Sequence, residues 1–438
     1  MGVFKWHCLD RHDFNEAKND DESDTMRRMA DPIWHAVVLA YTIRCGSTVK
    51  IMSAPWIIVL DQPGSVLSGE TIDGDAGNQN ERRVGGVFIT APFCKVTGCT
   101  IRNTSGVGIG VSHGARATQL IGNTIEDTWM QAIGFFHREE DYSGSLVSQN
   151  VVRRAGLDSI SIGGTGNVLV MQNDVADCQF AGIYALTGTQ DAHIVGNKLN
   201  DCYGGVDVSW GVAGGHRAGT DLTHGIVIER NRVSRCMGGI GTGSNGTVMI
   251  GNIVTDSGQG MRQTYTLMGA TPSVTARGSG YTVGDVLRLP LDGSATNLPG
   301  KVVVREVDAN GGVVRAEVWY VGVYFTPPSN PITLAGGTGS GASITVPTWN
   351  RRNAEPIGMG VVDACDCIIT GNISGNVESA NMTQKVGFVV KRVFTAPVRN
   401  QIFGNNFSRN ALAAVTGYYA NRYTTGTLTG NTIGQNVT

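Results

Sequence analysis

The sequence predicts an all-β fold, a right-handed parallel β-helix, on three observations. A short pattern recurs along the chain: an apolar residue, a Gly or polar residue, Asn, one further residue and a second apolar residue. Apolar and polar residues alternate within the copies, which is typical of strands with one buried face. Glycine is abundant, with 61 residues in 438, and supplies tight corners. A repeat period of about 20 to 50 residues indicates a solenoid.

The recurring Asn sets the register of the coils. Nine copies are centred on Asn123, Asn150, Asn173, Asn197, Asn231, Asn252, Asn372, Asn405 and Asn431. Four and five residues later come a polar turn position and a small residue, as in Asp177 and Cys178. Equivalent positions of stacked coils lie ~4.8 Å apart, so the Asn side chains can form a ladder. With two earlier turns at 66–72 and 95–101 we expect about eleven coils, and crossovers between parallel strands are almost always right-handed.

The elements divide the chain into four parts. Residues 1–55 form an N-terminal segment with a capping helix over 25–44, or two short helices if Asp31-Pro32 begins a second one. Residues 56–265 form the first part of the β-helix. Between Asn252 and Asn372 the spacing widens to 120 residues, and alternating strands around Asn310-Gly311 predict an inserted small antiparallel β-domain over 266–349. Residues 350–438 form the last coils.

Composition excludes several function classes. A net charge of −2 argues against nucleic acid as a main partner. No apolar run approaches the ~20 residues that span a bilayer, and the N-terminus lacks the apolar core of a signal peptide, so we expect neither membrane insertion nor cleaved export. The nine cysteines match no zinc-ligand spacing. We therefore expect free, buried thiols, no metal and no cofactor.

One outward column of the coils gathers residues that suit a glycan. Aligning the strand after each small residue gives Gly134, Ser161, Tyr184, Asp207, Gly241 and Arg262. Two long loops leave the end of this strand, at 135–142 and 210–224. They carry the candidate substrate-binding residues His137, Glu139, Glu140, Asp141, Trp210, His216 and Arg217, to which Arg262 is added. Aromatic rings, carboxylates and cations on one face are typical of a polysaccharide groove.

Two chemistries are open at this face. Hydrolysis of a glycoside takes two carboxylates, and Asp207 with Asp221, or with an acidic residue of the first loop, supplies them. Elimination would instead use Tyr184, His137 or His216 as base, and Arg262 to neutralise a uronate. The predicted catalytic residues are Asp207, Asp221 and Tyr184.

Two regions of the chain resemble a known family. The polar run at 19–25 and the strand at 45–55 resemble the N-terminal cap of pectate-lyase-like β-helix proteins, especially phage tailspikes. The segments 278–285, 307–311 and 336–342 resemble a small β-module of virion tail proteins. The resemblance implies a homotrimeric virion tail protein, made in the host cytoplasm, that contacts other tail proteins and a bacterial surface polysaccharide, often as a depolymerase.

The resemblance predicts the fold more strongly than it predicts the activity, because one fold hosts many functions. Nothing in the chain matches a lyase or epimerase catalytic motif, and Met26-Arg-Arg-Met29 departs from the usual start of the capping helix. Two functions stay open: a polysaccharide depolymerase, and a structural or receptor-binding tail protein that holds glycan without cutting it. A bacterial polysaccharide lyase or epimerase is a weaker alternative.

Overall fold

The computed structural model describes most of the chain after residue 47. The described residues are 48–49, 56–74, 84–136, 140–164, 166–186, 188–208, 223–236, 238–258, 264–267, 270–291, 299–320, 322, 324, 326–352, 357–377, 384–391, 397–419, 422–424 and 428–436. The predicted capping helix lies outside them. No helix in this part of the chain is long and apolar enough to cross a membrane.

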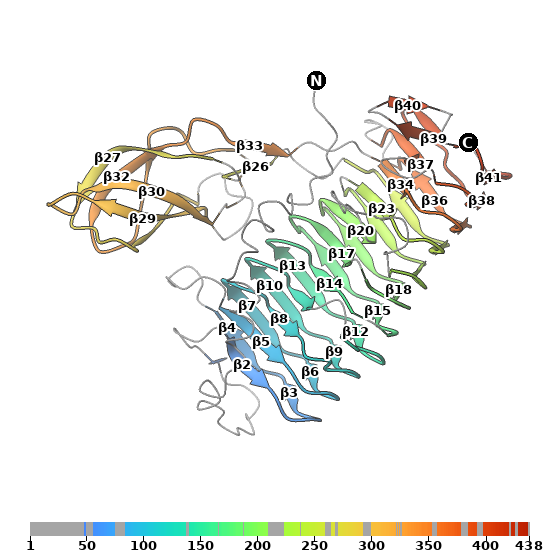
Figure 1. Ribbon diagram of the computed structural model, residues 1–438, viewed down its shortest axis with the longest axis horizontal. Coiled ribbons are helices and arrows are strands. Elements are labelled where there is room, and N and C mark those ends of the chain that lie inside the picture. Colours follow the sequence, from blue (N-terminus) through green and yellow to red (C-terminus); the bar gives the residue numbers. More distant parts are fainter. Residues whose placement is uncertain are drawn as a thin grey trace.

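Three long sheets run along the molecule, and most coils, here called rungs, give one strand to each sheet (Figure 1). Sheet A contains β1 (Thr48–Val49), β4 (Thr71–Asp73), β7 (Thr100–Thr104), β10 (Thr124–Thr128), β13 (Val151–Ala155), β16 (Asp174–Ala176), β19 (Lys198–Asn200), β22 (Arg232–Ser234), β25 (Ile253–Thr255) and β36 (Ile373–Gly375). Sheet B contains β2 (Trp56–Leu60), β5 (Gly85–Ile89), β8 (Ile109–Val111), β11 (Ile133–Phe135), β14 (Ile160–Ile162), β17 (Ala181–Ala185), β20 (Gly204–Val208), β23 (Gly238–Thr242), β34 (Ile357–Val362), β37 (Val386–Lys391), β39 (Ala413–Tyr419) and β40 (Arg422–Thr424). Sheet C contains β3 (Val66–Ser68), β6 (Lys95–Thr97), β9 (Gln119–Ile121), β12 (Leu146–Ser148), β15 (Leu169–Met171), β18 (His193–Val195), β21 (Val227–Glu229), β24 (Val248–Ile250), β35 (Ile368–Thr370), β38 (Gln401–Phe403) and β41 (Thr432–Ile433). The pairing between rungs is parallel, and only β40 runs antiparallel to its neighbour β39. The molecule is the predicted parallel β-helix.

The predicted Asn ladder is present and fully hydrogen-bonded. Each Asn donates through Nδ2 to Oδ1 of the next one, at 2.9–3.0 Å from Asn123 as far as Asn405. The last member corrects the sequence alignment. Asn405 donates to Asn436 at 3.0 Å, whereas Asn431 belongs to a second short ladder with Asn400. The ninth copy was therefore placed five residues too early.

The polar residues that follow each ladder Asn by four positions are explained by their backbone conformation. They adopt the left-handed conformation, with φ of 52–60° at Asp127, Arg154, Asp177, Asp201, Arg235 and Asp256. Asp tolerates this conformation better than most residues. The two Arg among them reach back one rung, since Arg154 Nε lies 2.8 Å from Asp127 and Arg235 Nε lies 3.0 Å from Asp201.

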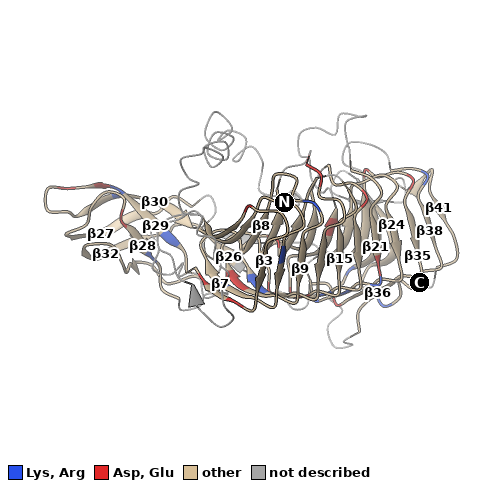
Figure 2. Ribbon diagram, turned by 90° about the horizontal axis from the view of Figure 1, so that it is seen from below, with Lys and Arg blue, Asp and Glu red and all other residues tan. Residues whose placement is uncertain are grey.

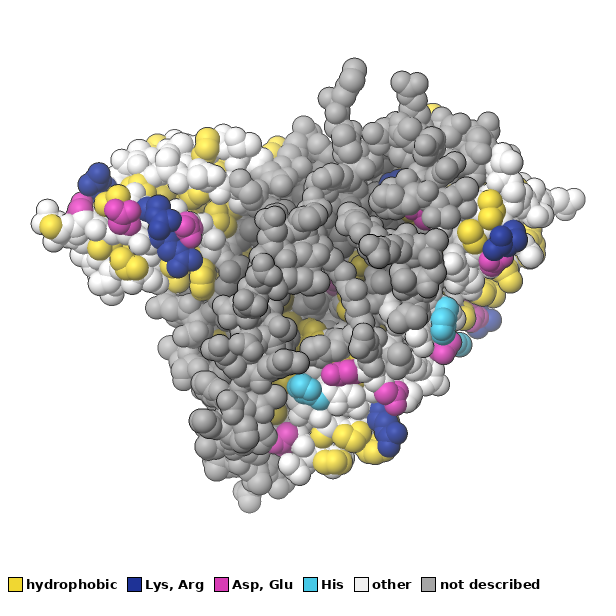
Figure 3. Space-filling view, in the orientation of Figure 1, with side chains coloured by type: hydrophobic (Ala, Val, Ile, Leu, Met, Phe, Trp, Pro, Cys, Tyr) yellow, Lys and Arg dark blue, Asp and Glu magenta, His cyan; other side chains and the backbone are white. Residues whose placement is uncertain are grey.

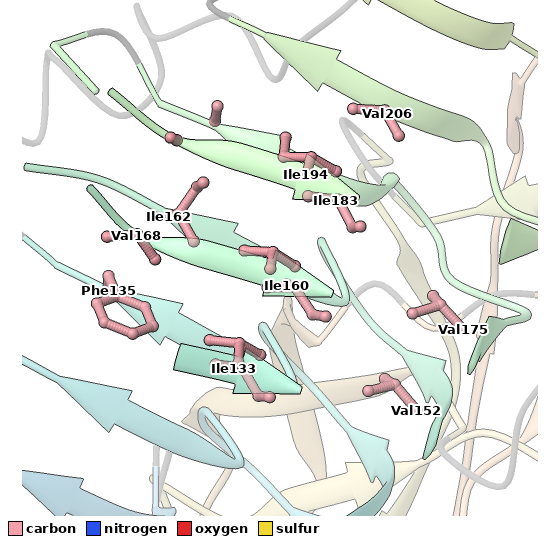
Figure 4. Close-up of a cluster of buried hydrophobic side chains, with 14 of the residues drawn as sticks. Ile133, Phe135, Val152, Ile160, Ile162, Val168, Val175, Ile183, Ile194 and Val206 are labelled. Atoms are coloured by element: carbon pink, nitrogen blue, oxygen red, sulfur yellow. The ribbon is translucent and has the colours of Figure 1, made fainter. Parts of the chain in front are cut away.

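The core fills the interior of the solenoid with columns of identical or similar side chains. Ile133, Ile160, Ile183 and Val206 lie above one another on successive strands of sheet B and point inward (Figure 4). The small column carries buried free cysteines at 178, 202 and 236, and none of the seven cysteines of the described residues forms a disulfide.

An insert of antiparallel strands interrupts the solenoid between β25 and β34. It comprises β26 (Thr264–Thr266), β27 (Ser273–Ser279), β28 (Val286–Arg288), β29 (Lys301–Val307), β30 (Val313–Tyr320), β31 (Ile332–Thr333), β32 (Ser340–Thr345) and β33 (Asn350–Arg352). It has its own hydrophobic core. Charged side chains gather on its surface (Figure 3), where Arg305 pairs with Glu317 at 2.9 Å. Figures 1 and 2 place the insert beside the solenoid, level with the early rungs.

Candidate functional site

The outer face of sheet B departs from strict strand alternation. A Cβ added at Gly205 would lie 2.4 Å from Val233 in the core, whereas one at Gly204 would lie 3.1 Å from Oδ2 of Asp207. Gly204 and Asp207 therefore share the outer face, and the two residues between them, Gly205 and Val206, both face inward. The same register holds on neighbouring rungs, because Ala181 pairs with Gly204 and Tyr184 pairs with Asp207.

This register confirms most of the predicted outward column. Successive pairings join Gly134, Ser161, Tyr184, Asp207 and Gly241. The strand that pairs with β23 on the next rung is β34, which places Gly360 beside Gly241. The sequence alignment, which placed Arg262 beside Gly241, was wrong. The reason is the insert, which leaves the solenoid after β25 and displaces the next rung to residue 357. Arg262 itself lies outside the described residues.

Asp207 sits in a partly desolvated position on this face. Burial raises the pKa of its carboxyl to about 7, and the charge of Asp158 adds to the rise. Tyr184, one rung earlier, is 8% exposed. A carboxyl with a pKa near 7 is poised for acid–base chemistry, while the role of Tyr184 as a base stays a prediction.

Asp158 is the site residue that the sequence alignment missed. It lies two residues before Ile160, whose partner is Ile183, so it faces Ala181 one rung on. Its Oδ1 accepts a hydrogen bond from Ala181 N at 3.1 Å. Burial raises the pKa of Asp158 to about 7, although this hydrogen bond opposes the rise. The sequence marks Asp158 only by its charge. The equivalent positions of the neighbouring rungs are uncharged, namely Gln131, Ala181, Gly204 and Gly238.

Asp158 and Asp207 approach each other from rungs two steps apart. The two rung steps separate their backbones by about 9.6 Å along the axis. Asp207 reaches back over Gly204, and Asp158 reaches forward to Ala181, so both carboxylates flank Ala181. The charge of Asp158 contributes to the raised pKa of Asp207, so the two carboxyls are close enough to interact.

The first predicted loop does not bring its acidic residues to Asp207. Glu140 Oε2 accepts hydrogen bonds from Gly114 N and from the Tyr142 hydroxyl, both at 2.8 Å. Asp141 Oδ1 accepts from Ser143 N at 2.8 Å, and this bond lowers the pKa of Asp141. Both residues follow β11, three rungs before Asp207, and bond within their own loop. Seven other predicted residues lie outside the described part: His137, Glu139, Trp210, His216, Arg217, Asp221 and Arg262.

A pocket extends from Asp207 toward the later rungs. Its interior is small, with a volume of about 20 Å³, and it opens to solvent; we call it the trough. Gly241 and Gly360 form its floor, Ile357 and Val389 give it apolar walls, and Lys391 lies at its far end. The space above Gly360 is occupied by Val389, whose Cγ1 would lie 2.6 Å from a Cβ added at this glycine.

The insert docks on the solenoid close to the other end of the site. Tyr320 stacks on Trp129 with ring centroids 4.2 Å apart, and Lys301 Nζ lies 4.3 Å from the Trp129 ring centre. Lys301 is 2% exposed, and burial lowers its pKa to about 8. Trp129 precedes β11 and lies one rung before Asp158. The insert therefore contacts the solenoid next to the start of the sheet B strand of that rung.

Comparisons with known proteins bear on the fold. A family model described as a right handed beta helix region matches residues 85–212 and 140–274. With the three parallel sheets, this makes the fold a right-handed parallel β-helix, as predicted. No curated protein sequence matches the chain.

Several solved structures are similar to the chain at low identity. The Dettilon tailspike protein is 13% identical with a TM-score of 0.45, covering 83% of this chain and 56% of that one. The catalytic unit of an alpha-1,3-glucanase from Streptomyces thermodiastaticus is 12% identical with a TM-score of 0.41, covering 87% and 62%. The tailspike protein of Acinetobacter baumannii phage AM24 is 10% identical with a TM-score of 0.27, covering 70% and 66%. The chain thus spans less than two thirds of each of these proteins, and the likeness does not extend to substrate or activity.

Proposed function

We propose that this chain is a virion tail protein that binds a bacterial surface polysaccharide and cleaves it by glycoside hydrolysis at Asp158 and Asp207. The observation that carries the proposal is the pair of carboxyls on the outer face of sheet B, both with a pKa near 7. The tail role comes from the resemblance of the N-terminal cap and the insert to tailspikes and virion tail modules.

The surroundings of the two carboxyls assign their roles. The hydrogen bond from Ala181 N favours the ionised form of Asp158, so Asp158 acts as the base that activates water. The negative charge of Asp158 favours the protonated form of Asp207, so Asp207 is the acid that protonates the leaving oxygen. We propose that the activated water attacks the face opposite the leaving oxygen, which gives inversion at the anomeric carbon and requires carboxyl groups ~6.5–9.5 Å apart.

The walls of the site suit a glycan chain lying along the solenoid axis. Phe180 and Tyr203, with ring centroids 6.3 Å apart, stand at the edge of sheet B beside Ala181 and Gly204. Such rings offer apolar faces to sugar rings and polar tips to their hydroxyls. The trough continues the same path beyond Asp207.

The test uses purified protein with a panel of bacterial capsular polysaccharides and lipopolysaccharides. We expect new reducing ends from at least one polysaccharide, no unsaturated uronate absorbance, and loss of cleavage in Asp158→Asn and Asp207→Asn. Asp191→Asn, a carboxylate 61% exposed near His224, is the matched control and keeps full activity. Proton NMR of the first product identifies the anomer.

Other outcomes select the alternatives. Uronate absorbance would make the chain a lyase and remove the hydrolytic roles of both aspartates. A polysaccharide that binds tightly yet yields no product would make it a receptor-binding tail protein without catalysis.

We further propose that the tail protein is a homotrimer that associates through the outer face of sheet C. This face carries a strip with the apolar side chains of Leu146, Leu169, Met171, Val195, Val227, Val248, Ile250, Ile368 and Phe403, interrupted by His193 and Glu229. Ile250, Ile368 and Phe403 are 38%, 36% and 40% exposed. Seven strands at ~4.8 Å make the strip about 30 Å long, comparable to the apolar patches that mark interaction sites. The flat face suits further copies of the same chain, and the number three comes from the resemblance.

A further inference from the structure

We infer that the insert positions Asp158 through Trp129, which makes Trp129 and Tyr320 positioning residues for the cleavage. The inference rests on the proposed function, since it concerns the geometry of the same pair of carboxyls. Trp129 is only 4% exposed, and the apolar side chain that packs against it is Tyr320 of the insert. The two rings stack with their centroids 4.2 Å apart and 19° between their planes. A ring of the solenoid is thus covered by the insert.

The insert presents two neighbouring strands to Trp129. Tyr320 at the end of β30 pairs with Lys301 at the start of β29, and Lys301 Nζ lies 4.3 Å from the centre of the Trp129 ring. Val302 and Val313 of the same strands belong to the insert's own hydrophobic core, which keeps this edge in place. Stacking and cation–π contacts both depend on how a ring is turned. The contact therefore sets the orientation of Trp129 as well as its position.

Backbone contacts connect Trp129 to Asp158 on the next rung. The amides of Gly156 and Leu157 donate to the carbonyl oxygens on either side of Trp129, at 2.8 and 3.3 Å. A Cβ added at Gly156 would lie 2.3 Å from the Trp129 carbonyl oxygen, so the two backbones touch at this point. Asp158 follows Leu157 directly. A displacement of the Trp129 backbone is therefore passed to the segment that carries the carboxyl.

The position of the 156–158 segment sets both the direction and the burial of the Asp158 carboxyl. Its Oδ1 is held from the following rung by Ala181 N at 3.1 Å, and a shift of the segment lengthens this bond. Burial raises the pKa of Asp158 to about 7, so a shift that admits water lowers the pKa toward its ordinary value. Misplacement of a catalytic group by ~1 Å can cost about 100-fold in rate.

The experiment compares the full-length variants Tyr320→Ala and Tyr320→Phe with the wild type. Phe keeps the stacked ring and Ala removes it, and Tyr320 is not part of the insert's own core, so the insert keeps its fold. Trp319→Ala is the matched control, because Trp319 is the preceding ring on β30 and stacks with Arg305 instead. Hydrogen exchange followed by mass spectrometry reports on the amides of Gly156 and Leu157 without any substrate.

Tyr320→Ala should change exchange and catalysis together. We expect the two amides to exchange about 10-fold faster, and kcat to fall about 10-fold with little change in KM. The acid limb of the pH profile should move to lower pH, because the Asp158 carboxyl becomes more hydrated. Tyr320→Phe and Trp319→Ala should match the wild type. Trp129→Leu should reproduce Tyr320→Ala, and the double variant should be no worse than either single one, since both remove the same contact.

The two proposals fail in different ways. Wild-type exchange at Gly156 and Leu157 in Tyr320→Ala would overturn the positioning role and leave the hydrolase standing. Equally fast exchange in Trp319→Ala would overturn it too, because the effect would then be a general loosening of the insert. A wild type that cleaves no polysaccharide of the panel would remove the hydrolase, and the exchange rates would still decide whether the insert holds the 156–158 segment.

Discussion

Replacing Asp207 by Asn should stabilise the protein at alkaline pH and not at acidic pH. In the folded chain the pKa of Asp207 is raised from an ordinary value near 3.8 to about 7, first by burial and then by Asp158. Between these two values the folded state holds a proton that the unfolded state has released, so stability falls as pH rises through this window. Asn stays neutral throughout and avoids the loss.

The magnitude follows from the size of the pKa change. A rise of this size corresponds to about 4 kcal/mol, and solvent screening of a partly exposed carboxylate reduces it to about 2–4 kcal/mol. The entropy of unfolding of a 438-residue chain is about 0.9 kcal/mol/K. The Tm of Asp207→Asn should therefore exceed that of the wild type by about 2–4 °C more at pH 8.5 than at pH 4.5.

The assay is thermal melting followed by circular dichroism at one scan rate across a pH series. Asp191→Asn, at a carboxylate that is 61% exposed, is the control for the substitution of an aspartate by asparagine. A Tm difference for Asp207→Asn that is equal at pH 4.5 and pH 8.5 would refute the reasoning. Asp207 would then be ionised at neutral pH and unable to serve as the acid.

Three further predictions rest on other parts of the structure. Hydrolysis should show a bell-shaped pH profile centred near pH 7, because one carboxyl of Asp158 and Asp207 must be protonated and the other ionised; a rate that stays flat from pH 5 to pH 9 would contradict the pair. Asn197→Ala should destabilise the fold by about 3–5 kcal/mol in denaturant or thermal melts, because four ladder hydrogen bonds lose their partner. Light scattering should give three times the chain mass of 46.3 kDa, and a double substitution of Ile250 and Ile368 by Glu should give the monomer; a wild-type monomer would remove the trimer.

The fold could be predicted because its main determinant is periodic. The Asn, the turn residue and the small residue each repeat in sequence, and each has one physical role per rung. The error at Asn431 shows the limit of this reasoning. Its local pattern matches the others, and only the pairing of Ile433 with Ile402 shows that Asn436 continues the main ladder. The register of one rung on another is decided by which strands pair. A motif of five residues does not specify that pairing.

The site could be predicted only in part, for a geometric reason. Counting back from inward Ile160 by strict alternation places Ser159 outside and Asp158 inside. In the structure two consecutive residues of this strand face inward, as Gly205 and Val206 do on β20, and Asp158 faces outward. The alignment could therefore place Tyr184 and Asp207 correctly and still miss the second carboxylate. Contacts made by the long loops depend on conformations that no repeat specifies.

The same irregularity explains how a solenoid can bring two carboxyls together at all. With regular alternation, one outward column presents side chains in parallel, ~4.8 Å apart, all pointing straight out. When two consecutive residues face inward, the residues on either side of them both face outward, so the sheet has two outward columns. One column contains Asp207, and the other contains Ala181 and Gly204. Asp158 and Asp207 come from different columns and lean toward each other from rungs two steps apart. Burial raises the pKa of both carboxyls, and the charge of Asp158 adds to the rise at Asp207. The resulting loss of stability at neutral pH is offset elsewhere, in the Asn ladder and the core columns that these surface positions do not disturb.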